Sequence, residues 1–555
     1  MGFARGHQLN KTPMLEIKRV LVVDGIDDVC VKVLADAGFQ VDKKDKITKD
    51  EVLATIKDYD ALIVRSATKV TKEIIAAGTR LKIIGRAGTG VDNIDTDAAT
   101  HAGIIVMNTP GGNTLSAAEH TCAMISALAR QIPQAHATMK QGKWDRKNFM
   151  GVELHGKTIA ILGLGRIGRE VATRMQAYGM KTIGYDPILP KEAAKAINID
   201  AYDLDELWPL ADFITVHTPL TESTRHLLND AVLAKCKKGV RIVNCARGGI
   251  IEEAALLRAL ESGHVAGAAL DVFDEEPPKD IANNKLIQHP NCIVTPHLGA
   301  STEEAQAKVA LEIGQQIVEA THGSQIMGAV NAPAMMHALR DDLKPWVILG
   351  SKLGLLAAQL MVGSAFEKGS SKWLHRLTVT AQGKAIQSSS STLCAAVLMG
   401  ILNHLQATPV NLVNASMIAD ALGLHVREER TSEPHDEYQN VLSLRYTTET
   451  EDHEYAGTVF GTNNLRFTRI DQFAFEVRPA GHLMFYRNED KPGVIAAIGT
   501  HLAQASINIA DLTLGRDDSK REALCIVNTD QPIPADVLQR IQQTSFITYA
   551  RTVTL

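Results

Sequence analysis

A glycine-rich turn is the first feature of the sequence that could do chemistry. Gly163, Gly165 and Gly168 have the spacing G-x-G-x-x-G, between a short apolar run (157–162) and an amphipathic segment that begins near Ile167. Glycines at this spacing make a tight turn, let the backbone approach a diphosphate and seat a helix on a strand, while free N–H groups at the helix N-terminus stabilise the anion. The turn therefore predicts a dinucleotide site, the alternative being a strand, turn and helix without a ligand.

An acidic residue at the end of the next apolar run indicates which dinucleotide binds. Asp186 ends the stretch 181–186, at the distance of about 20 residues that this kind of site requires. A carboxylate there accepts hydrogen bonds from both ribose hydroxyls and repels a 2′-phosphate. We therefore expect NAD, and not NADP, as the cofactor.

Three further residues could supply acid–base and anion-binding chemistry. His297 follows the apolar run 292–297, and histidine is the usual proton acceptor because its pKa lies near the working pH. Arg247 ends another apolar run before two glycines, and its guanidinium could hold a carboxylate with two hydrogen bonds. Glu276 lies in a loop that two prolines end, where it could fix the tautomer of a histidine. Each has a plainer alternative, because a histidine is often structural and an acidic loop is often only solvated.

Taken in order, the glycine turn, Asp186, Arg247, Glu276 and His297 resemble the D-isomer-specific 2-hydroxyacid dehydrogenase family, over about residues 18–330. The stretches GRAGTGVDNID (85–95), NTPGGNTLSAAEHT (108–121) and PHLGAST (296–302) resemble the branch of that family that acts on D-3-phosphoglycerate. The resemblance implies that Arg247 binds and orients the substrate, that Glu276 partners the histidine and that His297 carries the proton. It also implies cofactor contacts at Thr89, Arg166, Ile167, Thr218, Cys245, Ala246, Asp271 (to the nicotinamide carboxamide), His297, Leu298, Gly299 and Ala300.

Arginines at two other strand ends predict a phosphate on the substrate. Arg65, with Ser66 beside it, and Arg86 each end an apolar run, and two guanidiniums with a hydroxyl fit a phosphate dianion. Solvated strand-end charges are the alternative. Further substrate contacts are expected from the backbone at Ala87 and Gly88, from Asn113, and from Arg146, which the family implies comes from a neighbouring subunit.

The elements that must position these residues form an α/β pattern. Continuous apolar runs at 19–25, 61–66, 81–88 and 104–108, and again from 157 to 297, alternate with helical segments, which is typical of parallel strands buried on both faces. We expect two doubly wound parallel-sheet domains. One is a flavodoxin-like substrate domain made of residues 15–115 and 298–330, and the other is a Rossmann NAD domain of residues 116–297. The helix after His297 is expected to return the chain to the first of them.

The C-terminal part of the chain predicts two further domains. Residues 331–480 resemble the α/β intervening domain of longer family members, with a strand, helix and strand over 410–430 and a hairpin that turns at 462–464. Residues 481–555 have the order βαββαβ of a ferredoxin-like fold and, with EDKPGV (489–494), resemble a regulatory ACT domain. That resemblance makes L-serine a candidate effector, with Asn488, Asp490 and Asn508 as its candidate contacts.

Composition excludes several classes of function. The 555 residues carry a net charge of −5, so no basic surplus suggests a nucleic-acid partner, and no apolar run is long enough to span a bilayer. The seven cysteines are scattered without C-x-x-C spacing, so we expect no metal site and a reducing, cytoplasmic location. Residues 1–13 are expected to be a disordered leader. We also expect a homo-oligomer, with a tetramer as the preferred state.

Two other functions remain open from the sequence. Another D-2-hydroxyacid dehydrogenase, acting on glycerate, lactate or 2-hydroxyglutarate, would need neither the arginine pair nor the long C-terminal extension. An NAD-binding transcriptional corepressor would keep the same fold and triad, but it should end in a disordered tail.

Overall fold

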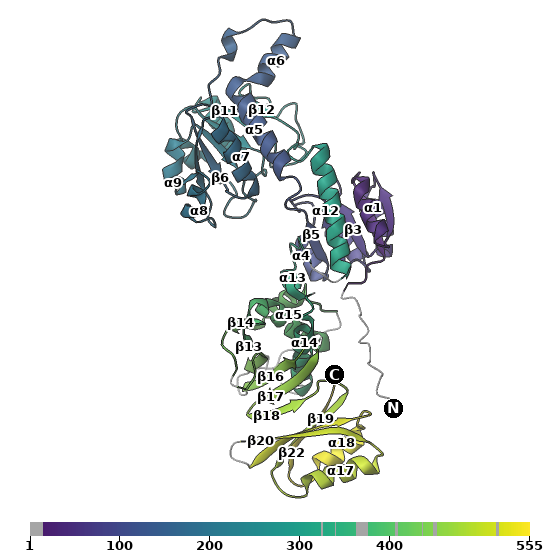
Figure 1. Ribbon diagram of the computed structural model, residues 1–555. Coiled ribbons are helices and arrows are strands. Elements are labelled where there is room, and N and C mark those ends of the chain that lie inside the picture. Colours follow the sequence, from purple (N-terminus) through teal and green to yellow (C-terminus); the bar gives the residue numbers. More distant parts are fainter. Residues whose placement is uncertain are drawn as a thin grey trace, which may run out of the picture. The chain divides into compact units, whose positions relative to one another are not determined.

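The computed structural model describes residues 15–322, 326–338, 340–361, 376–405, 409–435, 437–447, 452–517 and 521–555, which Figure 1 colours along the sequence. The predicted leader at residues 1–13 lies outside this range. The chain divides into two compact units. The first comprises residues up to 87, 91–108 and 313–555, and the second comprises residues 88–90 and 109–312.

The second unit is built on a seven-stranded parallel sheet with the strand order β12-β11-β10-β9-β6-β7-β8. The strands are β6 (Thr158–Leu162), β7 (Lys181–Tyr185), β8 (Asp200–Ala201), β9 (Phe213–Val216), β10 (Val240–Asn244), β11 (Val265–Leu270) and β12 (Cys292–Val294). The order reverses between β6 and β9, and dinucleotides bind beside the carboxyl ends of the strands at such a switch point. This is the predicted Rossmann arrangement.

Helices cover both faces of this sheet because its strands are apolar on both faces. The helices are α5 (Thr114–Arg130), α6 (Ile132–Lys140), α7 (Arg166–Ala177), α8 (Lys191–Lys195), α9 (Leu204–Leu207), α10 (Asp230–Lys235) and α11 (Glu253–Glu261). Ile125 of α5 and Val171 of α7 pack in one core cluster with Ile161 of β6, while Leu256 of α11 packs in the other with Leu162. Successive residues of β6 thus face opposite layers, as a strand buried on both sides requires.

The first unit begins with a five-stranded parallel sheet of order β2-β1-β3-β4-β5, the predicted flavodoxin-like order. Its strands are β1 (Arg19–Val23), β2 (Gln40–Lys44), β3 (Ala61–Val64), β4 (Ile83–Arg86) and β5 (Ile105–Asn108), with helices α1 (Asp28–Asp36), α2 (Lys49–Thr55), α3 (Lys72–Ala77) and α4 (Thr96–His101). Helix α12 (Glu303–His322) returns the chain to this sheet, since an added Cβ at Gly85 would lie 2.9 Å from Ile313.

The described residues between 331 and 480 form a mixed sheet with helices, which is the predicted α/β class. The sheet has the order β14-β13-β15-β16-β17-β18, from β13 (Arg376–Gln382), β14 (His425–Thr431), β15 (Val441–Thr447), β16 (Asp452–Phe460), β17 (Asn464–Ile470) and β18 (Phe473–Val477). Its helices are α13 (Met335–Ala338), α14 (Lys344–Met361), α15 (Ser390–Leu405) and α16 (Ala415–Ala421). The predicted hairpin joins β16 to β17 and is confirmed.

One predicted strand of this region is wrong. The start of 410–430 is a turn before α16, because two asparagine side chains replace strand pairing. Asn411 Oδ1 accepts the N–H of Val413 at 2.9 Å, and Asn414 Oδ1 accepts the N–H of Asn411 at 2.7 Å. Asparagine favours such local turns, and the apolar neighbours concealed them in the sequence.

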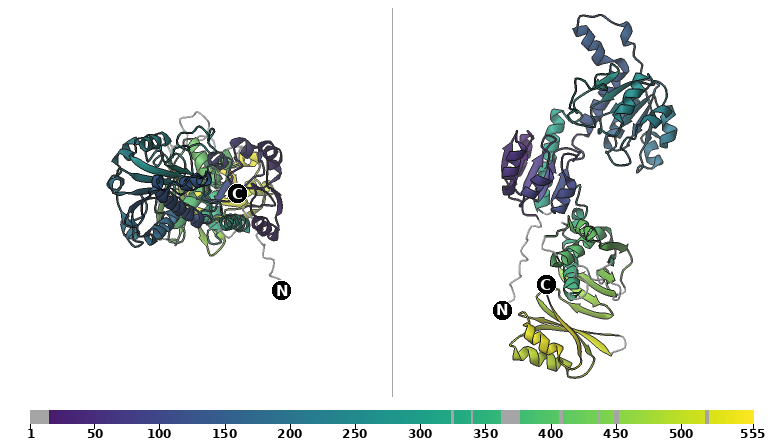
Figure 2. Two further views of the ribbon diagram at one scale, coloured as in Figure 1. Left: turned by 90° about the horizontal axis from the view of Figure 1, so that it is seen from above. Right: turned by 180° about the vertical axis from the view of Figure 1, so that it is seen from behind.

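The last part of the chain has the βαββαβ order that the sequence predicts. It consists of β19 (His482–Glu489), α17 (Val494–Gln504), β20 (Ile509–Arg516), β21 (Glu522–Thr529), α18 (Ala535–Gln542) and β22 (Ile547–Thr554), in an antiparallel sheet of order β20-β21-β19-β22. Both helices lie on one face of this sheet (Figure 2), where Ile498, Leu502 and Ile541 bury their side chains against Met484 and Val527.

Candidate active site

The glycine turn joins β6 to α7, and each of its three glycines has a distinct role. Gly163 has a φ of 94°, and an added Cβ there would lie 2.6 Å from the carbonyl oxygen of His217. At Gly168 an added Cβ would lie 2.1 Å from the carbonyl oxygen of Gly163. Gly165 differs, because nothing lies within 4 Å of its Cβ position. The first and third glycines are therefore required by packing, and the second leaves open space at the N-terminus of α7.

Asp186 follows β7 at the edge of the sheet where the turn lies. Its Oδ2 accepts the N–H of Leu164 at 2.8 Å, and its Oδ1 accepts the N–H groups of Ile188 and Leu189 at 2.9 and 3.0 Å. Burial alone would raise the pKa of Asp186, but these three hydrogen bonds hold that pKa below its usual value. The carboxylate is therefore ionised at neutral pH, and Oδ2 keeps a lone pair for a ribose hydroxyl.

Two more of the predicted cofactor residues follow β9 and β10, neighbouring strands on one side of the switch point. Thr218 comes shortly after β9, and its Oγ1 is buried without a hydrogen-bond partner among the described residues. Such a group costs about 1–3 kcal/mol, so a ligand atom is the natural partner. Cys245 follows β10, and burial raises the pKa of its thiol to about 12, which keeps it protonated and unreactive. An orphaned hydroxyl, open space above a helix N-terminus and an ionised carboxylate together fit a dinucleotide.

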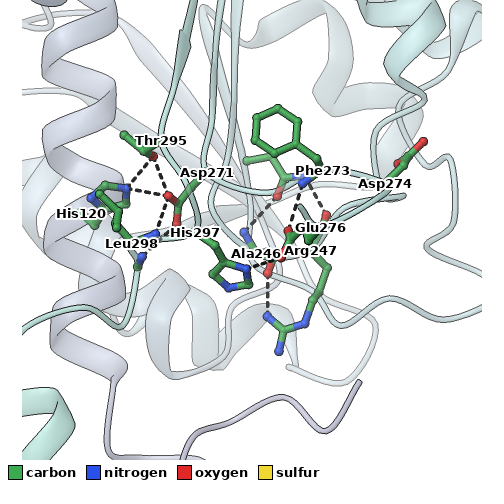
Figure 3. A network of polar contacts seen from close by, with 12 residues as sticks. His120, Ala246, Arg247, Asp271, Phe273, Asp274, Glu276, Thr295, His297 and Leu298 are labelled. Atoms are coloured by element: carbon green, nitrogen blue, oxygen red, sulfur yellow. Dashed lines mark hydrogen bonds and ion pairs between the residues drawn. The ribbon is translucent and has the colours of Figure 1, made fainter. Parts of the chain in front are cut away.

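His297 and Glu276 lie within hydrogen-bond distance of each other. The Nδ1 atom of His297 lies 2.6 Å from Oε2 of Glu276, and Oε1 of Glu276 accepts the N–H of Phe273 at 3.1 Å (Figure 3). Both side chains are partly exposed. Glu276 precedes a cis peptide bond to Pro277. Because Nδ1 faces the carboxylate, Nε2 is the nitrogen that can exchange a proton with a substrate.

Arg247 is carried on a loop that touches the segment of Glu276. Asn244 shapes this loop, since its side chain donates to the carbonyl oxygen of Arg247 at 2.8 Å and accepts the N–H of Ala246 at 3.0 Å. An added Cβ at Gly248 would lie 1.8 Å from the carbonyl oxygen of Phe273. The two backbones are thus in direct contact, and the guanidinium of Arg247 lies in the same cluster as Glu276 and His297 (Figure 3).

Asp271 follows β11 and is the centre of a buried network. Its carboxylate accepts the hydroxyl of Thr295 at 2.5 Å and the N–H groups of Leu298 and Gly299 at 2.7 and 2.9 Å, and it lies 3.2 Å from Nε2 of His120. Burial would raise the pKa of Asp271, but the hydrogen bonds from His120, Thr295 and Leu298 lower it below the usual value. Only Oδ2, which accepts one of these bonds, has a lone pair left for a carboxamide.

His120 is a residue of this network that no sequence pattern reveals. This residue lies within a helix of mostly small residues, where a single histidine shows no spacing to any other polar group. Its partners are about 150 and 175 residues away in the sequence, so that only the fold reveals the contact.

The predicted substrate contacts are divided between the two compact units, and those to the phosphate lie in the first. Arg65 and Arg86 lie at the carboxyl ends of the paired strands β3 and β4, with Ser66 and Ala87 beside them in the first unit. Burial lowers the pKa of the Arg65 guanidinium, and the nearby carboxylate of Asp24 opposes that effect. Gly88, Asn113 and Arg146 belong to the second unit, where Asn113 accepts the hydroxyl of Thr89 at 2.7 Å.

The candidate effector residues have protein partners in the structure. Asn488 is nearly buried, and its Nδ2 donates to the carbonyl oxygen of Glu489 at 2.6 Å. Asp490 pairs with Arg516 at 2.9 Å. The side chain of Asn508 donates to Asp530 at 2.7 Å. A ligand that used these groups would have to displace some of these contacts.

Three family models match the chain. Residues 122–299 match the NAD binding domain of the D-isomer specific 2-hydroxyacid dehydrogenases, residues 342–471 match the D-3-phosphoglycerate dehydrogenase intervening domain, and residues 482–546 match the ACT domain. A folded ACT domain at this end disfavours the corepressor alternative, which requires a disordered tail.

Similar proteins from distant organisms carry one name. The D-3-phosphoglycerate dehydrogenase of Homo sapiens is 54% identical over 411 residues, which are 74% of this chain and 75% of that protein. The enzymes of that name from Synechocystis and Methanocaldococcus jannaschii are 42% and 40% identical over 97% and 95% of this chain, and over 95% and 97% of their own lengths. Among solved structures, a glyoxylate reductase from Paecilomyes thermophila is 31% identical with a TM-score of 0.51, over 56% of this chain and 98% of its own.

Proposed function

The chain belongs to the D-3-phosphoglycerate dehydrogenases, a branch of the D-isomer specific 2-hydroxyacid dehydrogenase family, and we propose that it oxidises D-3-phosphoglycerate to 3-phosphohydroxypyruvate with NAD, the first step of L-serine biosynthesis. The observation that carries this proposal is the hydrogen bond of 2.6 Å between Nδ1 of His297 and Glu276 at the carboxyl edge of the sheet. It supplies a base with a fixed tautomer beside a site that fits a dinucleotide.

The acid–base step follows from this geometry. Because the Nδ1–H group of His297 donates a hydrogen bond to Glu276, Nε2 is the unprotonated nitrogen of the ring. Nε2 takes the proton of the substrate 2-hydroxyl. The substrate loses two electrons and a hydrogen nucleus from C2 as hydride, and NAD, when bound, is the acceptor for that hydride. The imidazolium that forms is stabilised by the carboxylate of Glu276. Arg247 holds the substrate carboxylate and polarises the oxygen on C2.

The proposed cofactor contacts divide by the part of NAD that they would hold. The N-terminus of α7, at Gly163, Gly165, Arg166, Ile167 and Gly168, would hold the diphosphate, and Asp186 would hold the ribose. Asp271 would accept from the carboxamide through Oδ2. The remaining contacts that we propose are Thr89, Thr218, Cys245, Ala246, His297, Leu298, Gly299 and Ala300.

The proposed substrate contacts account for the phosphate. Arg65, Ser66 and Arg86 would bind it, and the backbone at Ala87 and Gly88, together with Asn113, would bind the rest of the substrate. If the arginines engage the phosphate, its removal should cost several kcal/mol of binding, because each guanidinium forms charge-assisted hydrogen bonds.

Turnover of two substrates tests the proposal. NADH formation is measured with D-3-phosphoglycerate and with D-glycerate, for the native chain, His297→Ala and the exposed control His425→Ala. Turnover should require the phosphate, vanish in His297→Ala and survive in His425→Ala. Equal turnover of glycerate, or an active His297→Ala variant, would reject the assignment.

We further propose that the segment 131–151 is covered by a second copy of the chain. Trp144 and Met150 are 75% and 84% exposed there, and Ile132 and Met139 are also exposed, and exposed apolar side chains gathered in one region are typical of protein–protein interfaces. Arg146 lies in this segment and would reach the site of the second copy. Light scattering should give a multiple of the chain mass, with a tetramer as the expected state.

L-serine is proposed as an effector of the ACT domain, and the location is proposed to be cytoplasmic. The match to a regulatory domain and the polar groups of Asn488, Asp490 and Asn508 support the first proposal. The seven cysteines support the second, because all are free thiols. No helix among the described residues is long and apolar enough to cross a bilayer. Unchanged turnover at millimolar L-serine would reject the effector role.

A further inference from the structure

The loop that carries His297 is held by one buried carboxylate. The N–H of His297 donates to the carbonyl oxygen of Asp271 at 2.9 Å, and the next two N–H groups, of Leu298 and Gly299, donate to its Oδ1 and Oδ2 at 2.7 and 2.9 Å. His297 itself has a φ of 56°, in the left-handed region. A residue other than glycine stays there only where its surroundings fix it, at a cost of about 1–3 kcal/mol. Asp271 is the residue that fixes it.

A histidine on a neighbouring helix holds this carboxylate in turn. The Nε2 atom of His120, on α5, lies 3.2 Å from Oδ1 of Asp271 and 3.2 Å from Oγ1 of Thr295. The ionised carboxylate has no hydrogen, so the single hydroxyl hydrogen of Thr295 goes to it, at 2.5 Å. Nε2 of His120 must therefore carry the remaining hydrogen and donate it.

The same helix holds the other end of the loop. Ser116, one turn before His120, donates its hydroxyl to the carbonyl oxygen of Gly299 at 2.8 Å. His120 thus contacts the loop at Thr295 and Ser116 contacts it at Gly299, with His297 between them. In Figure 3, His120, Thr295, Asp271 and Leu298 form one connected cluster beside the imidazole of His297.

We propose that His120 is a positioning residue for the oxidation proposed above. By donating to Asp271 and Thr295 it holds the loop 295–299, and with it the imidazole of His297, at the orientation that meets Glu276 and the substrate. Its polar contacts among the described residues are to Asp271 and Thr295, and not to Glu276, so its effect on the reaction passes through Asp271. Misplacement of a reacting group by about 1 Å can cost a hundredfold in rate, so the loss of this support should be measurable.

Hydrogen exchange of the full chain without NAD tests the contact apart from any activity. In His120→Leu, the amides of Leu298 and Gly299 should exchange about tenfold faster than in the native chain, since their acceptor is no longer held. In His120→Gln, whose amide nitrogen can donate in the same place, the rates should return to within about threefold of native. Amides of β6 (Thr158–Leu162) serve as the control and should not change. Unchanged exchange at Leu298 and Gly299, or an equal rise in β6, would overturn the proposal.

Steady-state kinetics test the consequence for the reaction. With D-3-phosphoglycerate and NAD, His120→Leu should lower kcat about tenfold and change KM for D-3-phosphoglycerate less than threefold, because none of the proposed substrate contacts lies on the loop 295–299, and His120→Gln should restore kcat. A loss confined to KM, or no rescue by glutamine, would overturn the positioning role. If the native chain itself shows no turnover, the proposed function fails, and the exchange rates still decide whether His120 holds the loop.

Discussion

Replacing Glu276 with glutamine should disable His297 without moving it. The carboxylate now serves two donors, Nδ1 of His297 at 2.6 Å and the N–H of Phe273 at 3.1 Å. A glutamine amide can accept only one of them. If its oxygen faces Phe273, its NH₂ group faces Nδ1 and the imidazole proton moves to Nε2, the nitrogen that must accept the substrate proton. In the reverse orientation, the NH₂ group opposes the N–H of Phe273.

The size of the effect follows from the hydrogen bond that is lost. A hydrogen bond to a charged group contributes about 1.5–3 kcal/mol, and the partial exposure of both side chains, 46% for His297 and 35% for Glu276, places this one toward the lower part of that range. A loss of about 1.5–2.5 kcal/mol in the transition state lowers kcat about 10- to 70-fold. NAD affinity should not change, because Glu276 is not among the proposed cofactor contacts.

The neighbouring Glu275 offers a matched control. It is exposed and pairs with Lys279 at 2.8 Å. Glu275→Gln therefore removes the same charge at the position next to Glu276, without changing the partner of the His297 imidazole. Initial rates of NADH formation and the fluorescence titration of NADH should be measured for both variants. If Glu276→Gln retains the kcat of Glu275→Gln, the carboxylate does not set the tautomer and the argument is refuted.

Other predictions concern the cofactor site and stability. Thr218→Val should leave the melting temperature unchanged or higher, because it removes a buried unpartnered hydroxyl, yet weaken NAD binding by a few fold in a fluorescence titration. Gly168→Ala should unfold at lower temperature in circular dichroism, since its Cβ would lie 2.1 Å from a backbone oxygen, whereas Gly165→Ala should fold normally and lose NAD affinity. Asp60→Asn should destabilise the first unit, because backbone and Arg80 hydrogen bonds hold the pKa of Asp60 below its usual value against burial. A carboxyl with a lowered pKa stabilises the fold above about pH 4 and loses that effect as the pH falls further, so urea unfolding of the two chains should converge in acid and differ at neutral pH.

The elements with local signals could be predicted from the sequence. The glycine turn is recognisable in the sequence because only glycine fits at Gly163 and Gly168. The buried strands are recognisable by their continuous apolar runs. The parallel arrangement of both sheets and the βαββαβ order of residues 481–555 follow from the same kind of pattern. The turn made by the side chains of Asn411 and Asn414 could not be predicted in this way, because its apolar neighbours give the sequence the pattern of a strand.

The contacts that span long stretches of chain could not be predicted in this way. His120, Asp271 and Thr295 meet only because α5 packs against the sheet beside β11 and β12, and no spacing in the sequence relates them. The proximity of Arg247, Glu276 and His297 was accessible for a different reason. Each follows a strand of one parallel sheet, so topology brings them to one edge, and the family resemblance implies the roles proposed for them.

Transfer of a labelled hydrogen from the substrate tests the central claim most directly. D-3-phosphoglycerate with deuterium at C2 is incubated with NAD and the chain, and the NADH is examined by mass spectrometry. The deuterium should appear in the NADH, and turnover should be abolished in His297→Ala and retained in His425→Ala. Deuterium released to water, or labelled NADH formed by His297→Ala at the native rate, would contradict hydride transfer assisted by this histidine.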